Sequence, residues 1–418
     1  MTLLMKIWQK LLLAAGLVPA LLLIGACASC GGGGGTTSTT TPSVPAPAPV
    51  RTGTLLSEAS VFYPRLVRLA HQSDASLNGA VIASAMGFEG SQGQGRLFIS
   101  RDDGASYAPL GTVSDSRWPK GLCCGSIFEL RSPVGALPAG TLLWSASIGQ
   151  DTPGTAMTHP IYRSGDGGKT WTALGATCGV GRKPRNGDGT GIWEPEFQQA
   201  KDGTLVCMYS DETDDGASQV LKITTTADGV SWTAPRLLVA AVKASDRPGM
   251  AVTTRLGDGS YLMSYEFCST AGLDCRVYLK RSADGLDWGS PTDRGFEPKT
   301  ADGRWFRHAP TVVWLPASQR LALVGQILNT SAGSVDATGN GATVFLSSTA
   351  DGSGTWTTVP APVVPLSPPT QTNWCQNYSS PLLPSADGKQ LLMLGSDFEM
   401  LNGAQVCRTR FGRGALPG

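Results

Sequence analysis

Two glutamates stand out because each lies in an apolar, strand-like stretch directly after an aromatic residue. These are Glu194 and Glu266. An apolar setting raises the pKa of a carboxyl group, and hydrolysis of a glycosidic bond needs two carboxyl groups with different pKa values. One protonates the leaving oxygen, and the other attacks the anomeric carbon or activates water. We expect Glu194 and Glu266 to be this pair; the alternative is that each is a structural ion-pair partner of Arg65 or Arg247.

Further polar and aromatic residues fall where strands are expected to start or end. Aromatic rings stack on sugar faces and charged groups bind hydroxyls, so these residues are candidates for substrate binding. Four of them also have structural interpretations: Arg65 and Arg247 as rim charges, Asp211 as a solvated strand-end acid and His308 as a structural histidine. The candidates are Arg65, Trp193, Asp211, Arg247, Tyr265, His308 and Trp374.

A repeated turn defines the elements that must position these groups. The stretch Ser164–Trp171 (SGDGGKTW) combines Ser, Asp and Gly with a closing aromatic residue, which is typical of a tight turn between two strands. Related turns begin at residues 100, 226, 282 and 348, so successive turns lie 56 to 66 residues apart. A turn at a near-constant period indicates a repeat fold.

Each repeat divides into four antiparallel strands, the unit of a propeller blade. We therefore predict an all-β fold, a six-bladed β-propeller over residues 52–418. The last blade lacks a fourth strand, and Thr54 to Ser60 is expected to supply it and close the ring. A β-helix has too short a repeat to fit. In such blades the repeated turns lie on one face, and first-strand starts and second-strand ends converge on the other.

Composition restricts the partners and the compartment. The net charge is +1 and charged residues make up 16% of the chain, so a nucleic-acid partner is excluded. Residues 1–26 resemble a lipoprotein signal peptide: two lysines precede an apolar run, and Ile24-Gly25-Ala26-Cys27 resembles a lipobox in which Cys27 is lipidated. Residues 27–51 are expected to form a flexible tether. We predict an exported, membrane-anchored bacterial lipoprotein at the outer membrane or cell surface, and a monomer; the alternative is a freely secreted product.

Cysteine usage fits export. Apart from Cys27 and Cys30, eight cysteines remain. We expect disulfides, with Cys268–Cys275 as the first pair and Cys375–Cys407 as a second, whereas Cys207 in an apolar strand is expected to be a free core thiol. The three histidines lack ligand spacing, so we expect no metal and no cofactor.

The residues also carry a family resemblance. The repeated turns resemble the Asp-box (BNR) repeats of the sialidase superfamily. The segments 191–197, 203–212, 247–250 and 261–266 together resemble glycoside hydrolase family 93. This resemblance implies an exo-acting, retaining α-L-arabinanase on a six-bladed propeller, which releases arabinobiose from 1,5-linked arabinan. By motif position it implies Glu194 as acid/base, Glu266 as nucleophile and Tyr378 as a catalytic-site tyrosine.

Two other functions remain open. An exo-sialidase would need an arginine triad, to which Arg65 and Arg247 could contribute, and a tyrosine–glutamate couple such as Tyr378 with Glu266. However, no third arginine is evident near Tyr378. A non-catalytic glycan-binding propeller is the other alternative, and it is favoured if the two glutamates point apart.

Overall fold

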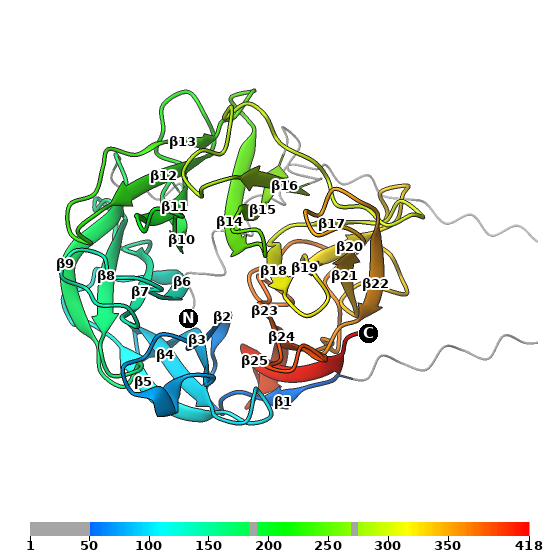
Figure 1. Ribbon diagram of the computed structural model, residues 1–418, viewed down its shortest axis with the longest axis horizontal. Helices are drawn as coiled ribbons and strands as arrows, with labels where there is room; N and C mark the ends of the chain where they lie inside the picture. Colours follow the sequence, from blue (N-terminus) through cyan, green and yellow to red (C-terminus); the bar gives the residue numbers. More distant parts are fainter. Residues whose placement is uncertain (1–50, 184–189, 269–274, 418) are drawn as a thin grey trace, which may run out of the picture. The chain divides into compact units, whose positions relative to one another are not determined.

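The computed structural model describes residues 51–183, 190–268 and 275–417, which form six antiparallel β-sheets. The sheets surround a central axis as the blades of a propeller (Figure 1). The predicted all-β, six-bladed fold is therefore confirmed. The expected signal peptide, the lipidated Cys27 and the tether up to residue 50 lie outside the described residues. None of the helices in the described ranges is long and apolar enough to span a membrane.

Blades 1 to 3 each contain four strands in sequential order, counted from the axis outward. A short 3-10 helix, Ala75–Leu77, lies between the first two strands of blade 1. The strands of blade 1 are β2 (Phe62–Arg68), β3 (Val81–Glu89), β4 (Gln92–Ser100) and β5 (Ala108–Val113). The strands of blade 2 are β6 (Leu122–Glu129), β7 (Leu142–Ile148), β8 (Thr158–Ser164) and β9 (Thr172–Val180). The strands of blade 3 are β10 (Ile192–Gln199), β11 (Leu205–Asp211), β12 (Val220–Thr226) and β13 (Arg236–Val239).

Blades 4 and 5 depart from the predicted plan. The strands of blade 4 are β14 (Arg247–Arg255), β15 (Tyr261–Cys268), β16 (Arg276–Ser282), β17 (Trp305–Arg307) and β20 (Ile327–Asn329). The strands of blade 5 are β18 (Thr311–Leu315), β19 (Arg320–Val324), β21 (Thr343–Ser347) and β22 (Trp356–Pro360). The expected four strands per blade do not hold in blade 4, because the chain leaves β19 after Val324 and the following β20 pairs with β17 of blade 4.

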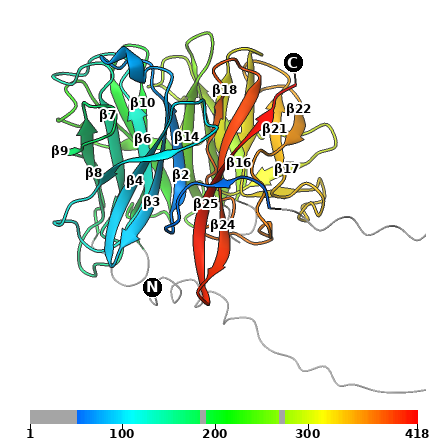
Figure 2. The same ribbon diagram turned by 90° about the horizontal axis from the view of Figure 1, so that it is seen from below.

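Blade 6 joins the two ends of the described chain. It consists of β23 (Leu382–Pro384), β24 (Gln390–Leu401), β25 (Ala404–Ala415) and β1 (Thr54–Leu55). Thr54 pairs with Phe411 and Leu55 with Arg410, so β1 is the outer strand and is shorter than the expected segment. The β24–β25 hairpin extends past the ends of the neighbouring strands (Figure 2).

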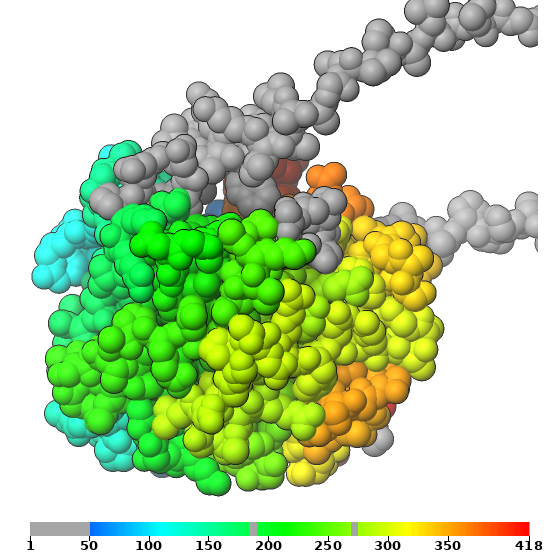
Figure 3. Space-filling view, turned by 90° about the horizontal axis from the view of Figure 1, so that it is seen from above, coloured from blue at the N-terminus to red at the C-terminus, as the bar shows by residue number. Residues whose placement is uncertain are grey.

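The second strands are buried on both faces because a blade packs on either side of them. Every residue of β11 and β15 is buried, which explains their continuous apolar sequences. Between blades 3 and 4 the core contains Met208, Met263 and Tyr265. The outer wall across blades 3 to 5 is a closely packed surface in Figure 3.

The repeated Asp turns are structural. Ser164 Oγ donates to Asp166 Oδ1 at 2.7 Å, and the Gly168 N–H donates to Ser164 Oγ at 2.9 Å. Trp171 closes the turn by donating its indole N–H to the Gly168 carbonyl at 2.9 Å. These turns join third and fourth strands, so they lie at the opposite end of the blades from the first-strand starts.

Four disulfides fix the described chain. The predicted pairs Cys268–Cys275 and Cys375–Cys407 are confirmed. The prediction of a free Cys207 is wrong, because Cys207 in β11 is bonded to Cys178 in β9 and so joins blades 3 and 2. The remaining bond, between the adjacent Cys123 and Cys124, was not anticipated.

Candidate active site

A residue with positive φ marks the start of the inner strand in every blade. In blades 1 to 4 the register between the first two strands shifts at this point, as it does between Trp193 and Glu196. Such a backbone costs a non-glycine residue of order 1–3 kcal/mol, and it takes the side chain out of the regular alternation of the strand. The residues concerned have φ between 47° and 65°, and they are Tyr63, Cys124, Glu194, Met250, His308, Ala309, Asn377 and Ser379.

These positive-φ positions, here called the bulges, lie at the part of the candidate site nearest the propeller axis. Tyr63, Cys124, Met250 and Ala309 come from four different blades, yet they belong to one buried apolar cluster. Because four inner strands contribute to the same cluster, it lies where the blades meet. Glu194 occupies the equivalent position of blade 3, with a φ of 52°. Blade 3 therefore presents a carboxyl group at the position where four other blades present Tyr63, Cys124, Met250 and Ala309.

Glu194 is held by a neighbouring strand. Ser210, in β11, donates its hydroxyl hydrogen to Glu194 Oε2 over 2.5 Å. The same hydroxyl accepts a hydrogen bond from the backbone N–H of Met250 at 3.2 Å, so it links blade 3 to blade 4. This arrangement fixes one carboxylate oxygen of Glu194.

Glu266 reaches from the second strand of blade 4 to the start of blade 5. Its side chain is buried, and its Oε2 accepts a hydrogen bond from the Ala309 N–H at 2.8 Å. The Nδ1 atom of His308 lies 2.5 Å from the same oxygen. One oxygen of Glu266 therefore faces both a backbone donor and the imidazole of His308.

Two tyrosines and an arginine complete the inner part of the site. The ring of Tyr378 lies 5.7 Å from that of Tyr63 and 5.4 Å from that of His308, measured between centroids. Arg65 donates to the Tyr63 hydroxyl at 2.9 Å and to Ser379 Oγ at 2.9 Å. Blades 1, 5 and 6 therefore contribute to the same cluster as Glu194 and Glu266.

The site shifts the pKa values of Glu194 and Tyr378. Burial raises the pKa of Glu194 to about 7, the charges of Glu266 and Glu212 add to this rise, and the hydrogen bond from Ser210 opposes it. The charge of Glu266 acts on Glu194, so the two carboxyl groups lie near enough to interact. Burial also raises the pKa of Tyr378 well above its ordinary value, and the charge of Glu194 contributes.

The arginines do not neutralise the pair. Arg65 Nε lies 3.9 Å from Glu196 Oε2, and Arg247 is paired with Glu212. Within the described ranges, neither Glu194 nor Glu266 forms an ion pair with an arginine. This geometry is contrary to the structural alternative, in which Arg65 or Arg247 holds these glutamates.

Trp193 is connected to Arg247 through a residue that we did not select as a candidate. Its indole N–H donates to Glu212 Oε2 at 2.8 Å, and Glu212 Oε1 is bound by Arg247. Arg247 also donates to Gln219 Oε1 at 2.8 Å and to Ser218 Oγ at 2.7 Å. Trp193, Glu212 and Arg247 thus form one chain of hydrogen-bonded side chains next to Glu194, here called the Trp193–Glu212–Arg247 arm.

Two of the predicted binding residues are engaged elsewhere. Asp211 accepts hydrogen bonds from the Thr213 N–H at 2.7 Å and the Thr213 hydroxyl at 2.6 Å, so it closes the turn that follows β11. Tyr265 is fully buried in the core between blades 3 and 4, and its hydroxyl donates to the Arg294 carbonyl at 2.8 Å. Tyr265 and Glu266 are consecutive in a strand, so their side chains point to opposite faces.

Trp374 lies outside the inner cluster. It is 43% exposed, and its ring centroid lies 5.4 Å from that of Phe62 and 5.3 Å from that of Phe398. It therefore belongs to an aromatic group on the blade 6 to blade 1 side.

Several residues of the site were not among the sequence candidates. Ser210 and Glu212 follow the aromatic Tyr209 at the end of β11. Their place at the end of a second strand is the sequence feature that could have identified them as site residues. Tyr63 precedes Arg65 by two residues at an inner-strand start. Glu196 accepts a hydrogen bond from Ser126 Oγ at 3.3 Å, and burial raises its pKa.

One group of side chains has the composition of a metal site. The potential ligand atoms of Glu266, Cys268, Cys275 and His308 all lie within 4.8 Å of one another. However, the two sulfurs are joined in a disulfide, and only a thiolate is an effective zinc ligand. In this oxidised form the group offers one carboxylate and one imidazole.

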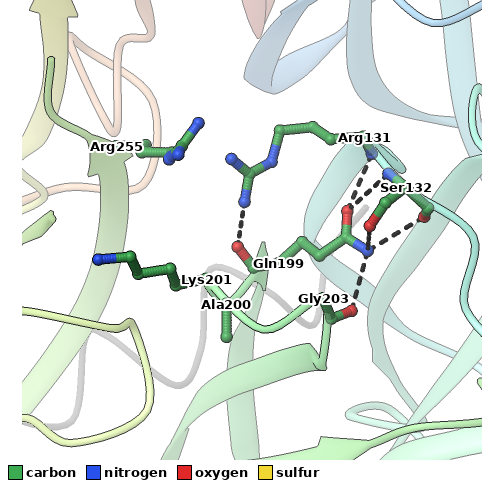
Figure 4. Close-up of a pocket in the computed structure, with 7 residues that line it drawn as sticks. All are labelled: Arg131, Ser132, Gln199, Ala200, Lys201, Gly203 and Arg255. Carbon is green, nitrogen blue, oxygen red and sulfur yellow. Dashed lines mark hydrogen bonds between the residues drawn. The ribbon is translucent and has the colours of Figure 1, made fainter. Parts of the chain in front are cut away.

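A basic pocket of about 180 Å³ lies at the opposite end of the blades. It is lined by residues at or just after the ends of the inner strands, including Arg131, Lys201 and Arg255 (Figure 4). The Lys201 N–H donates to the carbonyl of Asp284, a residue of an Asp turn, which places the pocket on the face of these turns. It is separate from Glu194 and Glu266.

Comparisons with known proteins identify the fold. Neither a scan against protein-family models nor a search of curated proteins gave a match. Solved structures do match. A Penicillium chrysogenum α-L-arabinanase complexed with arabinobiose has a TM-score of 0.67 and 23% identity, covering 87% of this chain and 98% of that chain.

Two further structures place the chain among propellers of this kind. A Fusarium graminearum α-L-arabinofuranosidase of glycoside hydrolase family 93, also with arabinobiose, gives a TM-score of 0.68 at 20% identity, covering 87% of this chain and 97% of that one. The NanB sialidase of Streptococcus pneumoniae has a TM-score of 0.53 and 11% identity, and the match covers 89% of this chain and 71% of the sialidase chain. At these identities the likeness shows a shared fold: this chain is a six-bladed propeller similar to those of arabinanases and sialidases.

Proposed function

We propose that this protein is an exported, retaining glycoside hydrolase that acts on the ends of α-1,5-linked L-arabinan and releases arabinobiose. The observation that carries the proposal is the pair of carboxyl groups in unlike environments. Glu194 has a pKa raised to about 7 by burial, whereas Glu266 accepts a backbone hydrogen bond and lies beside His308. Unlike environments for two nearby carboxyl groups are what acid and nucleophile roles require.

We assign the roles from the raised pKa of Glu194. Glu194 is protonated below about pH 7, so it acts as the acid that donates a proton to the leaving glycosidic oxygen. Glu266, as a carboxylate, attacks the anomeric carbon, and a covalent glycosyl-enzyme forms as the C–O bond to the leaving group breaks. Glu194, now deprotonated, takes a proton from water, which attacks the same carbon and frees Glu266.

Neighbouring groups support this sequence. Tyr378 and His308 lie beside the glutamates, and the raised pKa of Tyr378 keeps its hydroxyl as a hydrogen-bond donor. The Trp193–Glu212–Arg247 arm supplies an aromatic face and polar groups next to Glu194. Two solved propellers that resemble this chain are described in complex with arabinobiose, which supports an arabinan-type substrate.

The cellular setting is part of the proposal. Four disulfides fit an oxidising compartment outside the cytoplasm. We propose lipidation of Cys27 as the anchor and a monomeric enzyme. Cys27→Ser should move the protein from the membrane to the soluble fraction, and a variant that stays with the membrane would refute the anchor.

The function is tested with two substrates. The protein is incubated with linear 1,5-arabinan and, separately, with sialyllactose, and the released sugars are separated by chromatography. Arabinobiose from arabinan alone is expected. Free sialic acid would instead establish the sialidase alternative, which the present geometry does not favour because Arg247 is occupied by Glu212, Gln219 and Ser218.

A further inference from the structure

A ridge of aromatic side chains runs along the seam between blades 1 and 6. Phe88 lies 6.2 Å from Phe62, Phe62 lies 5.4 Å from Trp374, and Trp374 lies 5.3 Å from Phe398, measured between ring centroids. Phe62 begins β2, Phe88 is near the end of β3, and Phe398 is in the outer half of β24. These positions share the end of the blades at which the candidate active site lies.

The ridge continues onto the projecting hairpin. Met400 lies two residues beyond Phe398 on the same strand, so both side chains point to one face. Met400 is 69% exposed and Trp374 is 43% exposed. Single exposed apolar side chains are common on soluble proteins, whereas a contiguous group of them marks a binding surface.

A covalent bond fixes the most exposed ring of the ridge. Trp374 precedes Cys375, which is bonded to Cys407, and Cys407 is the cross-strand partner of Phe398. The disulfide therefore holds the loop of Trp374 against the hairpin where the Trp374 and Phe398 rings meet. A ring that is already ordered loses little conformational entropy when a ligand binds to it.

The ridge is continuous with the inner site. Phe62 is followed by Tyr63, whose ring lies 5.7 Å from that of Tyr378. The charged residues of the hairpin occupy the other face of β24, where Asp397 and Glu399 pair with Arg51 and Glu399 also pairs with Arg408. An uncharged ligand that extends from the candidate active site along this side therefore meets flat, apolar rings.

We propose that this ridge, Phe62, Phe88, Trp374, Phe398 and Met400, is a platform for the part of the glycan chain beyond the cleaved bond. The proposal rests on the proposed function, because an enzyme acting on chain ends holds the terminal sugars at the glutamates and must accommodate the remaining polymer outside. The ligand is a neutral arabinan segment of several residues, bound mainly through the Trp374 ring. The platform gives the protein preference for polymer over short oligosaccharides.

The first test measures binding without catalysis. Three proteins are run through native gels that contain linear arabinan. They are the inactive variant Glu266→Gln, the double variant Glu266→Gln with Trp374→Ala, and the double variant Glu266→Gln with Val230→Ala. Val230 is a matched control because it is 53% exposed and lies on an Asp turn at the other end of the blades. We expect the gel to retard the Glu266→Gln protein and its Val230 variant, and Trp374→Ala to weaken binding about tenfold. Equal retardation of the Trp374 variant, or no retardation of any variant, would overturn the platform.

The second test separates the platform from the proposed function. In the active protein, Trp374→Ala should lower kcat/KM on linear arabinan about tenfold and leave kcat/KM on arabinotriose within twofold. An equal loss on both substrates, or no loss on either, would overturn the platform while the released arabinobiose still supports the function. If neither substrate is cleaved, the proposed function fails, and the gel result alone decides whether the ridge binds the glycan. Cys375→Ser with Cys407→Ser should reproduce the selective loss on polymer.

Discussion

Ser210 joins the catalytic candidate Glu194 to the next blade: its hydroxyl donates to Glu194 Oε2 over 2.5 Å and accepts from the Met250 N–H at 3.2 Å. One hydroxyl therefore orients the proposed acid and ties the bulge of blade 3 to that of blade 4. Both bulged residues have positive φ, 52° at Glu194 and 58° at Met250. The strained backbone is stabilised where the proton transfer is expected.

Removing this hydroxyl should impair catalysis more than folding. In Ser210→Ala, Glu194 loses both an orienting contact and the hydrogen bond that lowers its pKa. We expect kcat to fall about tenfold and the alkaline limb of the kcat/KM profile to move to higher pH, measured by steady-state kinetics. Ser264→Ala is the control, because the buried Ser264 hydroxyl has no hydrogen-bond partner within the described ranges. Equal kinetics in the two variants would remove Ser210 from the mechanism.

The pH profile of the wild-type protein should report Glu194. Because the acid must be protonated and burial raises its pKa to about 7, kcat/KM should decline with a midpoint near pH 7 as the pH rises. A profile flat to pH 9 would contradict this role. In Glu194→Gln the limb should be absent from any residual activity on an aryl glycoside whose leaving group needs no proton.

The stability of the protein should depend on the same group in the opposite sense to an ordinary carboxylate. The pKa of Glu194 is higher in the folded than in the unfolded chain, so the folded state binds more protons between about pH 4.5 and 7. Stability contributed by the neutral form is present below pH 4.5 and is lost as the pH rises through 7. Glu194→Gln should remove this loss, which is about 3 kcal/mol, and denaturant unfolding at pH 4.5 and 8 measures it. An unchanged pH dependence in the variant would contradict the raised pKa.

Acid sensitivity should come from a different buried group. His159 in β8 is fully buried against Tyr209, its Nε2 lies 3.1 Å from Ser147 Oγ, and burial lowers its pKa to about 3. The folded chain therefore binds fewer protons than the unfolded chain between about pH 6.5 and 3, and stability falls as the pH falls through this window. His159→Gln should flatten this part of the stability curve in urea titrations. If the free energy of unfolding of His159→Gln falls with pH as steeply as that of the wild type, other groups cause the acid sensitivity.

The bond between blades 2 and 3 should contribute strongly to stability. Cys178 and Cys207 are 29 residues apart, and a loop of this length corresponds to about 3–4 kcal/mol of unfolded-state entropy. Both sulfurs lie in the core, so Cys178→Ala with Cys207→Val keeps the site apolar. Chemical denaturation should show a loss of this order, with activity retained in the folded fraction. A loss below about 1 kcal/mol would mean that the bond adds little to a ring already closed.

The blade count and the two faces could be predicted from sequence because the Asp turns are local. Ser164, Asp166 and Gly168 make their contacts within a few residues of one another, so the turn can be recognised from the local sequence. Glu194 and Glu266 could be selected as candidates for a similar reason, since each stands in an otherwise apolar strand. The irregular pairing of β20 with β17 depends on segments that meet only in the folded protein.

Side-chain direction was the harder part of the site. Tyr265 lies next to Glu266, but the strict alternation of β15 turns it into the core. Conversely, the bulges break the alternation at Tyr63 and Glu194, and no glycine marks them. The pairing of Arg247 with Glu212, and of Cys207 with Cys178, joins neighbouring elements whose relative position appears only in the assembled ring.

The central claim is that Glu194 is the acid/base and Glu266 the nucleophile of a retaining hydrolase, and azide rescue tests it most directly. Glu194→Ala and Glu266→Ala are each incubated with a nitrophenyl α-L-arabinobioside and sodium azide, and the anomeric configuration of the arabinobiosyl azide is read by NMR. We predict the α-azide from Glu194→Ala, because azide intercepts the covalent intermediate on Glu266. We predict the β-azide from Glu266→Ala, because azide replaces the missing nucleophile. If Glu194→Ala gives the β-azide and Glu266→Ala the α-azide, the two roles are exchanged. If either variant hydrolyses the substrate at the wild-type rate without azide, the claim that these two residues are the catalytic pair is contradicted.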